Sequence, residues 1–182
     1  MDTTSHRGRI WVLTDKSGKL IEDIDTDQIF HNAFLHITEL TEMGQYALGN
    51  LEGWKDFPKK TKPGDIIAAG RNFGAGSSRQ QAVDCFIALK VGAILAPSYS
   101  SIYFRNAVNS GFPILRCGDL DGLTAGRKLE SGDEVEVDFL SGKGSNLTKN
   151  IAFAVEPMSS VQRDIYHKEN LFTFGRSFGR GT

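Results

Sequence analysis

The stretch Asp65-Ile-Ile-Ala-Ala-Gly70-Arg-Asn-Phe-Gly74-Ala-Gly76-Ser77-Ser78-Arg79 decides the fold. It follows a Lys-Pro-Gly turn and opens with an apolar run, which predicts a short strand over residues 65–69. A glycine-rich loop comes next, and apolar residues then recur at i, i+3, i+4 and i+7, which predicts an amphipathic helix. The apolar positions of that helix are Ala82, Cys85, Phe86 and Leu89.

The same alternation continues along the chain. Gly92 is expected to end the helix. A strand over Ala93–Ala96, a helix over Ser101–Asn109 and a strand over Pro113–Leu115 are predicted after it. Strands and helices that alternate in this way indicate parallel β/α units. The fold class expected for this part is therefore α/β.

The segments before residue 65 give weaker signals. Residues 9–13 alternate as a first strand, a turn follows at 15–18, and a second short strand is expected near 19–22. Asp and Asn residues favour an irregular loop from Asp23 to His36. A helix is expected from Glu39 to Leu51, although its two glycines weaken it.

The last third has the pattern of an antiparallel unit followed by a helix. Glu134–Leu140 alternates as a strand, 141–144 resembles a turn, and Asn150–Val155 is expected to complete a hairpin. Ser159 stands three residues before Gln162, which predicts a capping box and a helix to about residue 170. The tail 172–182 has no period, and the sequence leaves open whether it is disordered or docks on a partner.

Length and composition predict one ordinary globular domain over 1–182. The chain has 182 residues, of which 40% are hydrophobic and 24% charged, and its formal net charge is −1. No overall field would attract nucleic acid or an anionic membrane. The polar start and the lack of a long apolar run predict neither a secretory signal nor a membrane span, so a cytoplasmic location is expected.

The cysteine content limits the cofactors that this chain can hold. Only Cys85 and Cys117 are present, and both are expected to be buried thiols. An iron–sulfur cluster is normally held by several cysteine thiolates. No metal site and no cofactor are therefore expected in this chain.

The loop from Gly74 to Arg79 carries the candidate chemistry. Gly74 and Gly76 lie where backbone N–H groups and the positive end of a helix dipole converge, an arrangement that binds anions. Neither a P-loop nor a dinucleotide fingerprint is present. Arg79 adds a fork suited to a carboxylate. The alternative is structural: Ser77 with Gln80, or Ser78 with Gln81, would each form a capping box.

A succession of blocks places the chain in a family. In order, the blocks are Asp25-Thr26-Asp27-Gln28-Ile29, Lys62-Pro63-Gly64-Asp65, Asn72-Phe73-Gly74-Ala75-Gly76-Ser77-Ser78-Arg79, Ile102-Tyr103-Phe104-Arg105-Asn106-Ala107 and Gly111-Phe112-Pro113. This succession resembles the small subunits of the 3-isopropylmalate dehydratase and homoaconitase family. The resemblance covers roughly residues 9 to 116.

The resemblance implies a fold, a reaction and a partner. The expected fold is the swivelling β/β/α domain of the aconitase C-terminal-domain type. Such a domain closes over a separate large subunit that holds a [4Fe-4S] cluster, as a heterodimer or heterotetramer. The implied activity is that of a hydro-lyase acting on a small di- or tricarboxylate, most directly 3-isopropylmalate in leucine biosynthesis. The iron would act as a Lewis acid on the departing hydroxyl.

Residue roles follow from the same resemblance. Ser77 matches the serine that takes the substrate proton, and Arg79 matches the arginine that grips a substrate carboxylate. Ser78 would help through its backbone. Asp27 matches the active-site aspartate, with turn capping as the alternative. Arg105 and Asn106 are interpreted as supporting or structural residues.

Serine is a weak base at neutral pH, so its alkoxide needs a prearranged positive environment. Loop N–H groups, the helix terminus and Arg79 would supply that environment.

The sequence also departs from the family pattern. Ala75 stands where a cysteine is usual, and Gln80-Gln81 where Glu-His is usual, which predicts altered packing and retained chemistry. In the loop that sorts substrates, His36 replaces the familiar Arg or Val. It is either a substrate contact or an exposed loop residue. The substrate could therefore also be another 2-substituted malate, such as a homocitrate-like or dimethylmalate-like compound.

Two alternative hypotheses assign the chain to other classes of protein. The loop could capture an anionic metabolite in a regulatory module without catalysis. A nucleotide-binding domain is the third reading, but the Gly-Lys-Ser/Thr sequence that it needs is missing.

Overall fold

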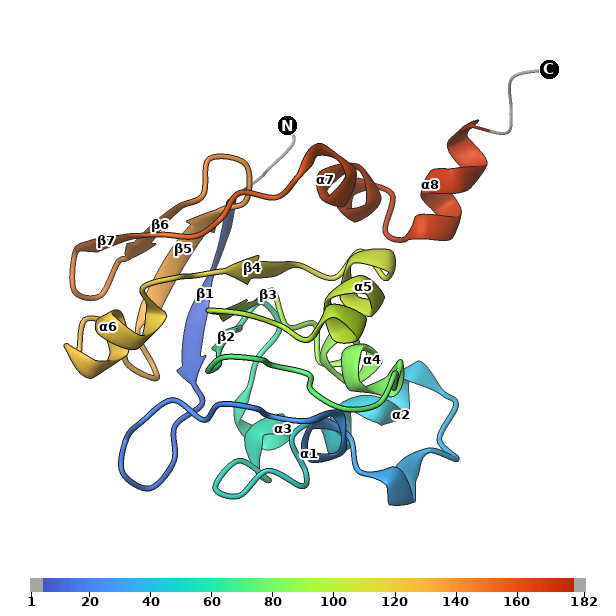
Figure 1. The fold of residues 1–182 in the computed structure, drawn as a ribbon, viewed down its shortest axis with the longest axis horizontal. Helices are drawn as coiled ribbons and strands as arrows, with labels where there is room; N and C mark the ends of the chain where they lie inside the picture. Colours follow the sequence, from blue (N-terminus) through green and yellow to red (C-terminus); the bar gives the residue numbers. More distant parts are fainter. Residues whose placement is uncertain (1–4, 179–182) are drawn as a thin grey trace.

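The computed structural model describes residues 5–178, with the backbone alone for residues 177 and 178. These residues contain a seven-stranded sheet in the order β4-β3-β2-β1-β5-β6-β7 (Figure 1). The strands are β1 (Ser5–Val12), β2 (Ile66–Ala68), β3 (Ala93–Ala96), β4 (Ile114–Arg116), β5 (Glu134–Asp138), β6 (Lys143–Asn146) and β7 (Ile151–Ala154). The helices are α1 (Thr26–Ile29), α2 (Leu40–Met43), α3 (Phe57–Lys60), α4 (Gln81–Ala88), α5 (Ser101–Asn109), α6 (Leu120–Ala125), α7 (Ser160–His167) and α8 (Leu171–Phe178).

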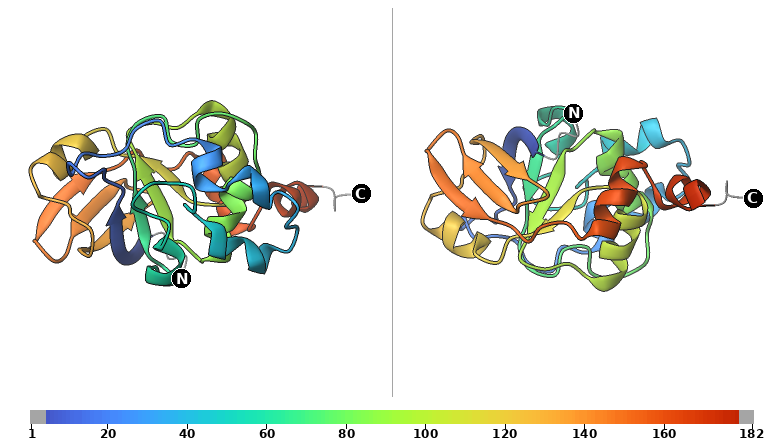
Figure 2. Two further views of the ribbon diagram at one scale, coloured as in Figure 1. Left: turned by 90° about the horizontal axis from the view of Figure 1, so that it is seen from below. Right: turned by 90° about the horizontal axis from the view of Figure 1, so that it is seen from above.

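One half of the sheet is parallel. Strands β1, β2, β3 and β4 pair in parallel, with Ile66 opposite Ile10 on one side and Ala93 on the other. Helices α4 and α5 are the crossovers between β2, β3 and β4, so the predicted β/α units are confirmed. Figure 2 shows these two helices at one end of the molecule and β5, β6 and β7 at the other.

The other half is antiparallel and corrects the predicted hairpin. Residues 134–140 do not pair with 150–155, because β6 lies between β5 and β7 and pairs with both. The expected turn at 141–144 overlaps the start of β6, and no strand was predicted there because β6 has no apolar residue. Gly144 lets the Phe153 ring lie against the backbone, since a Cβ there would stand 2.3 Å from a ring carbon. The amide of Asn146 is buried and donates to Asp133 Oδ2 at 2.7 Å.

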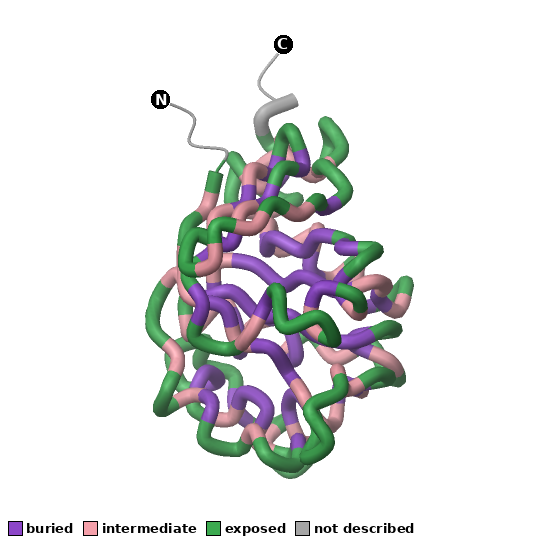
Figure 3. The backbone as a smooth tube through the Cα atoms, turned by 90° about the vertical axis from the view of Figure 1, so that its left-hand side faces the viewer, coloured by how far each residue is buried: buried purple, intermediate pink, exposed green. Residues whose placement is uncertain are grey.

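The sheet buries a cluster of apolar side chains on each face. Alternate residues of β1 belong to different clusters: Trp11 packs against the residues of α4 and α5, whereas Ile10 and Val12 pack with those of β4, β5 and α6. This is the period of two expected for a strand that is covered on both faces. Figure 3 shows the buried backbone concentrated in the middle of the molecule.

In the helical regions, two predicted segments differ from the structure and two helices were missed. The expected loop over 23–36 contains α1 and a 3₁₀ turn over Asn32–Phe34. The expected helix over 39–51 divides into α2 and a 3₁₀ turn over Gly44–Tyr46, and Leu48 then takes a positive φ of 57°. Helices α3 and α6 were not predicted, because each spans too few residues to show a helical period.

Two further expectations near β1 and α4 are wrong. Residues 19–22 form no strand, since Leu20 makes only an isolated bridge to Thr14. The C-cap of helix α4 is Leu89, and Lys90 after it takes a left-handed conformation (φ 55°). The helix therefore ends before Gly92, the residue that was expected to end it. Gly92 instead lies against the His6 ring, where any Cβ would collide with Nε2.

The chain ends in two helices. The capping box of Ser159 and Gln162 is confirmed at the start of α7, which ends at His167. The tail has a second helix, α8, where no period was recognised. The expected tail 172–182 therefore is helical as far as residue 178, and residues 179–182 lie outside the described part.

Candidate functional site

The glycine loop is held against the segment that leads into α1. Gly74 and Gly76 have φ of +78° and +91°, which favour glycine. A Cβ on Gly74 would stand 2.1 Å from Tyr103 Cγ, so this position also needs a bare backbone. The N–H of Gly74 donates to Ile24 O at 2.8 Å, and the N–H of Thr26 donates to Ala75 O at 2.9 Å. The two anion-loop glycines therefore place the loop directly beside α1.

Helix α1 exists because of its capping box. Asp25 accepts the N–H of Gln28 at 2.7 Å, and the Gln28 amide oxygen accepts the N–H of Asp25 at 2.9 Å. This reciprocal pair satisfies two donors at the start of a helix. Helix α1 carries Thr26 and Asp27 in its first turn, beside the glycine loop.

The Ser77 hydroxyl lies 3.1 Å from the hydroxyl of Thr26. Thr26 is only 3% exposed, whereas Ser77 is exposed. The N-cap residue of α4 is Gln80, and no side chain caps that helix. The capping-box alternative for Ser77 and Ser78 is therefore wrong. The Ser78 hydroxyl instead accepts a hydrogen bond from Asn106 Nδ2 at 3.3 Å.

Arg79 is fixed through one nitrogen of its guanidinium group. Nη1 donates to Asp27 Oδ1 at 2.9 Å, to Thr26 O at 3.2 Å and to Phe30 O. The side chain is only 12% exposed. Within the described part of the chain, these bonds all use Nη1, which leaves the Nε–Nη2 edge for an external acceptor. That edge has the geometry for two parallel bonds to a carboxylate.

Asp27 is charged at neutral pH and orients Arg79. Its partial burial alone would raise the pKa, but hydrogen bonds from Arg79 and from the N–H of Asn32 outweigh burial, so the pKa lies below its usual value. The bond from Asn32 is the turn-capping role foreseen as an alternative. Asp27 thus both orients Arg79 and caps the turn. Asn50 Nδ2 donates to its other carboxylate oxygen at 3.2 Å.

Three consecutive backbone N–H groups are open at the loop. Across residues 5–178, those of Gly76, Ser77 and Ser78 donate to no protein acceptor, and all three residues are exposed. Successive N–H groups of this kind form a concave binding site for anions. The loop thus carries an exposed hydroxyl and three unpaired N–H donors in the residues that directly precede Arg79.

The site residues predicted from the sequence are only partly assembled. Asp27 and Arg79 are joined directly, Ser77 reaches them through Thr26, and Ser78 is the next residue on the loop. His36 is exposed, and its Nδ1 lies 3.1 Å from Ala33 O. No interaction joins it to the other predicted residues in the described chain.

Sequence reasoning missed several residues around the site. Thr26, His31 and Asn50 had no assigned role, and Asn106 was given only a supporting or structural one. His31 Nε2 lies 3.8 Å from Asp27 Oδ2. The block Asp25–Ile29 contained Thr26, but only the structure shows which of its side chains faces Ser77.

The two thiols do not fit an iron–sulfur cluster. Cys85 and Cys117 are buried in the two different clusters of the core, one on each face of the sheet. Burial raises the pKa of Cys85, and it raises that of Cys117 to about 11. Both thiols therefore stay protonated at neutral pH, so no cluster is assigned to this chain.

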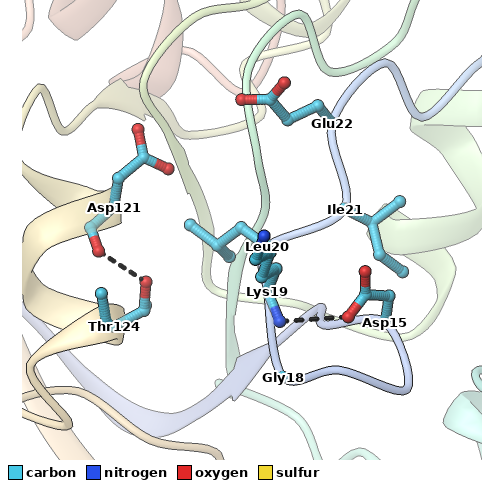
Figure 4. A pocket seen from close by; sticks show the side chains of 9 residues that line it. Asp15, Gly18, Lys19, Leu20, Ile21, Glu22, Asp121 and Thr124 are labelled. Carbon is cyan, nitrogen blue, oxygen red and sulfur yellow. Dashed lines mark hydrogen bonds between the residues drawn. The ribbon is translucent and has the colours of Figure 1, made fainter.

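In residues 5–178, no helix has the length and apolar composition needed to cross a lipid bilayer. A surface pocket of about 650 Å³ lies between residues 15–22 and α6 (Figure 4). None of its lining residues belongs to the glycine loop. Its charged lining residues are Asp15, Lys19, Glu22 and Asp121, and Arg71 pairs with the last two.

Comparisons with known proteins identify the family of the chain. Residues 55–117 match the family model of the aconitase C-terminal domain. The 3-isopropylmalate dehydratase small subunit of Caldicellulosiruptor saccharolyticus is 38% identical over 164 residues, which cover 90% of each chain. The 3-isopropylmalate dehydratase small subunit 1 of Archaeoglobus fulgidus is 38% identical, over 93% of this chain and 96% of the relative.

The solved structures show the same fold. A crystal structure of 3-isopropylmalate dehydratase from Methanocaldococcus jannaschii superposes with a TM-score of 0.82 at 29% identity, over 96% of this chain and 95% of that one. The expected α/β swivel-type domain of the aconitase C-terminal kind is confirmed. On the identity and coverage of these relatives, this chain belongs to the family of 3-isopropylmalate dehydratase small subunits.

Proposed function

We propose that this chain is the small subunit of a hydro-lyase that acts on 3-isopropylmalate in leucine biosynthesis. The observation that carries the proposal is the surface of the glycine loop. The Ser77 hydroxyl, the Nε–Nη2 edge of Arg79 and three open N–H groups lie there together. A base, a carboxylate clamp and an anion nest are the parts that proton removal beside a carboxylate requires.

Each of these residues has a role in the proposed mechanism. Arg79 binds a substrate carboxylate through two parallel hydrogen bonds, and Asp27 holds the guanidinium in that orientation. Ser77 takes the proton from the carbon next to the carboxylate. The alkoxide form of Ser77 is stabilised by the hydroxyl of Thr26 and by the positive nest, and Ser78 contributes through its backbone N–H.

The proposed partner is a large subunit that holds a [4Fe-4S] cluster. The relatives are named small subunits, which implies a larger one. Ser77 and Ser78 are exposed on this chain by itself, so a second surface is needed to exclude water from the reaction. We place the assembly in the cytoplasm, and we take this chain to form one swivel-type domain.

The substrate preference is proposed to depend on His36. It lies in the exposed loop after the 3₁₀ turn Asn32–Phe34, where relatives of this family are expected to sort substrates. The imidazole offers a polar contact to the variable end of a 2-substituted malate. His36→Arg should therefore change the ranking of substrates and leave the fold intact.

The test is an assay of this chain reconstituted with its large subunit against a panel of hydroxy di- and tricarboxylates. The proposal expects 3-isopropylmalate to have the highest kcat/KM. A preference for a homocitrate-like or dimethylmalate-like compound would keep the enzyme class and change the substrate. Tight binding of dicarboxylates without any turnover would instead support a regulatory anion-binding module.

A further inference from the structure

Helix α8 exposes an apolar surface that nothing else in the described chain covers. Phe172 is 82% exposed and Leu171 is 38% exposed, although both side chains are large and apolar. The helix packs against α7, and Figure 1 shows it extending beyond α7 and away from the sheet. Two adjacent exposed apolar side chains at the start of one helix form a candidate contact surface for a partner.

The start of α8 is fixed by local contacts. The Asn170 side chain accepts the N–H of Thr173 at 2.9 Å and its hydroxyl at 3.1 Å. This is the N-cap pattern that stabilises the first turn of a helix. The helix has only eight residues and includes Gly175, and isolated helices of that length are marginal in water. Packing on its apolar side would supply the stabilisation that its length does not.

A chain of contacts joins α8 to the glycine loop. Gln80 follows Arg79, and its Nε2 donates to Ser110 Oγ at 2.9 Å. The next residue, Gly111, lies against the backbone of Glu169, where a Cβ would stand 2.3 Å from the carbonyl oxygen. Glu169 directly precedes the cap of α8. The start of α8 is therefore linked to the glycine loop through the end of α5, on the side of the molecule where that loop meets α4.

We propose that α8 is a docking element for the large subunit and that Phe172 is its anchor. This inference rests on the proposed function, because it takes the glycine loop as part of the same interface. The sequence from 171 to 182 contains two arginines and no acidic residue. The surface that receives α8 is accordingly an apolar groove with an acidic rim.

A second copy of this chain fits α8 less well. A two-fold contact in which α8 packs on its own copy would bring like charges together. An apolar groove on a different subunit carries no such cost. The occupant that agrees with both the charge and the position of α8 is the iron–sulfur subunit.

The experiment compares Phe172→Ala with the control Leu147→Ala. Leu147 is also an exposed apolar residue, at 37%, but it follows β6 at the opposite end of the molecule. The large subunit is titrated with each variant, and the dissociation constant and the kcat at saturation are measured. Phe172→Ala should raise the dissociation constant by about tenfold or more, as expected for an interface anchor, with kcat and melting temperature unchanged. Leu147→Ala should bind as the wild type does.

The outcomes separate this inference from the proposed function. Equal affinity of Phe172→Ala and the wild type for the large subunit would remove α8 from the interface and leave the proposed function standing. Self-association of the wild type that Phe172→Ala abolishes would assign α8 to a contact between copies and overturn the inference. A wild-type chain that does not bind the large subunit at all would overturn both.

Discussion

Ser77 makes few structural contacts, so a substitution can distinguish a catalytic role from a structural role. Its hydroxyl bonds to Thr26 and does not cap α4. Ser77→Ala should therefore cost less than about 1 kcal/mol of stability, the net worth of an ordinary hydrogen bond. The kcat of the reconstituted enzyme should fall by roughly 10²–10⁴-fold, as for loss of a general base, with KM little changed. Thermal melting and steady-state kinetics measure the two effects.

Ser78→Ala is the matched control for this prediction. The neighbouring hydroxyl bonds to Asn106, and only its backbone N–H faces the proposed anion site. Its turnover should stay within a few-fold of the wild type. If the two serine variants lose turnover equally, Ser77 has no special part in proton transfer.

Thr26 is expected to set the basicity of Ser77. Thr26→Val keeps the shape of the side chain and removes the hydroxyl 3.1 Å from Ser77 Oγ. Loss of one hydrogen bond to a developing alkoxide should lower kcat by about tenfold, and the rising, acidic limb of the pH–rate profile, which reports the base, should move to higher pH. Thr26→Ser restores the hydroxyl and should restore both. A profile that does not move in Thr26→Val would limit Thr26 to packing.

Arg79→Lys tests the carboxylate clamp. Lysine keeps the positive charge but has no planar fork, so the bidentate contact is lost. KM for the substrate should rise by at least about tenfold, while kcat at saturation should fall less. The measurement is kinetics with substrate in excess. A variant with unchanged KM would contradict the proposed use of the Nε–Nη2 edge.

At the scale of elements, α1 links the stability of the site to pH. The pKa of Asp27 is lowered in the folded chain from its ordinary value of 3.8. The stabilisation from its pairing with Arg79 is therefore present above that value and is lost as the pH falls through the lower, folded pKa. The melting temperature of the wild type should fall more steeply than that of Asp27→Asn below about pH 4. Parallel melting curves across this range would mean that the pair contributes nothing to stability.

Elements with a clear period could be predicted, and those fixed by local contacts could not. Helix α5 was predicted with its observed bounds, Ser101–Asn109, and β3 likewise. Strand β6 was missed because its buried positions are Gly144 and Asn146, which have no apolar side chain. Helix α1 was missed because four residues show no period, although the Asp25 and Gln28 spacing of its capping box was visible.

At the scale of the molecule, the sequence identified the segments of the candidate site but did not show how they contact each other. The glycine loop and the Asp25–Ile29 block were recognised as parts of one family pattern, separated by about fifty residues. Their contact depends on backbone bonds from Gly74 to Ile24 and from Thr26 to Ala75. Such long-range pairing leaves no local signal, so the link from Ser77 to Thr26 needed the structure.

The glycine loop reaches the surface at one end of the parallel half of the sheet. Strand β2 lies in the interior of the sheet, and the loop that follows it emerges at its carboxyl end, where open α/β sheets place their ligands. The resulting site is open to solvent on one side. Ser77 and Ser78 face outward, and Arg79 presents one edge of its guanidinium.

The central claim is that this chain completes an active site on a large iron–sulfur subunit. The most direct test is a titration of the large subunit with this chain, with the turnover of 3-isopropylmalate measured at each step. The account predicts no turnover from either subunit by itself and a rate that rises to a plateau as the chain is added. A large subunit that reaches the full rate without this chain would contradict it.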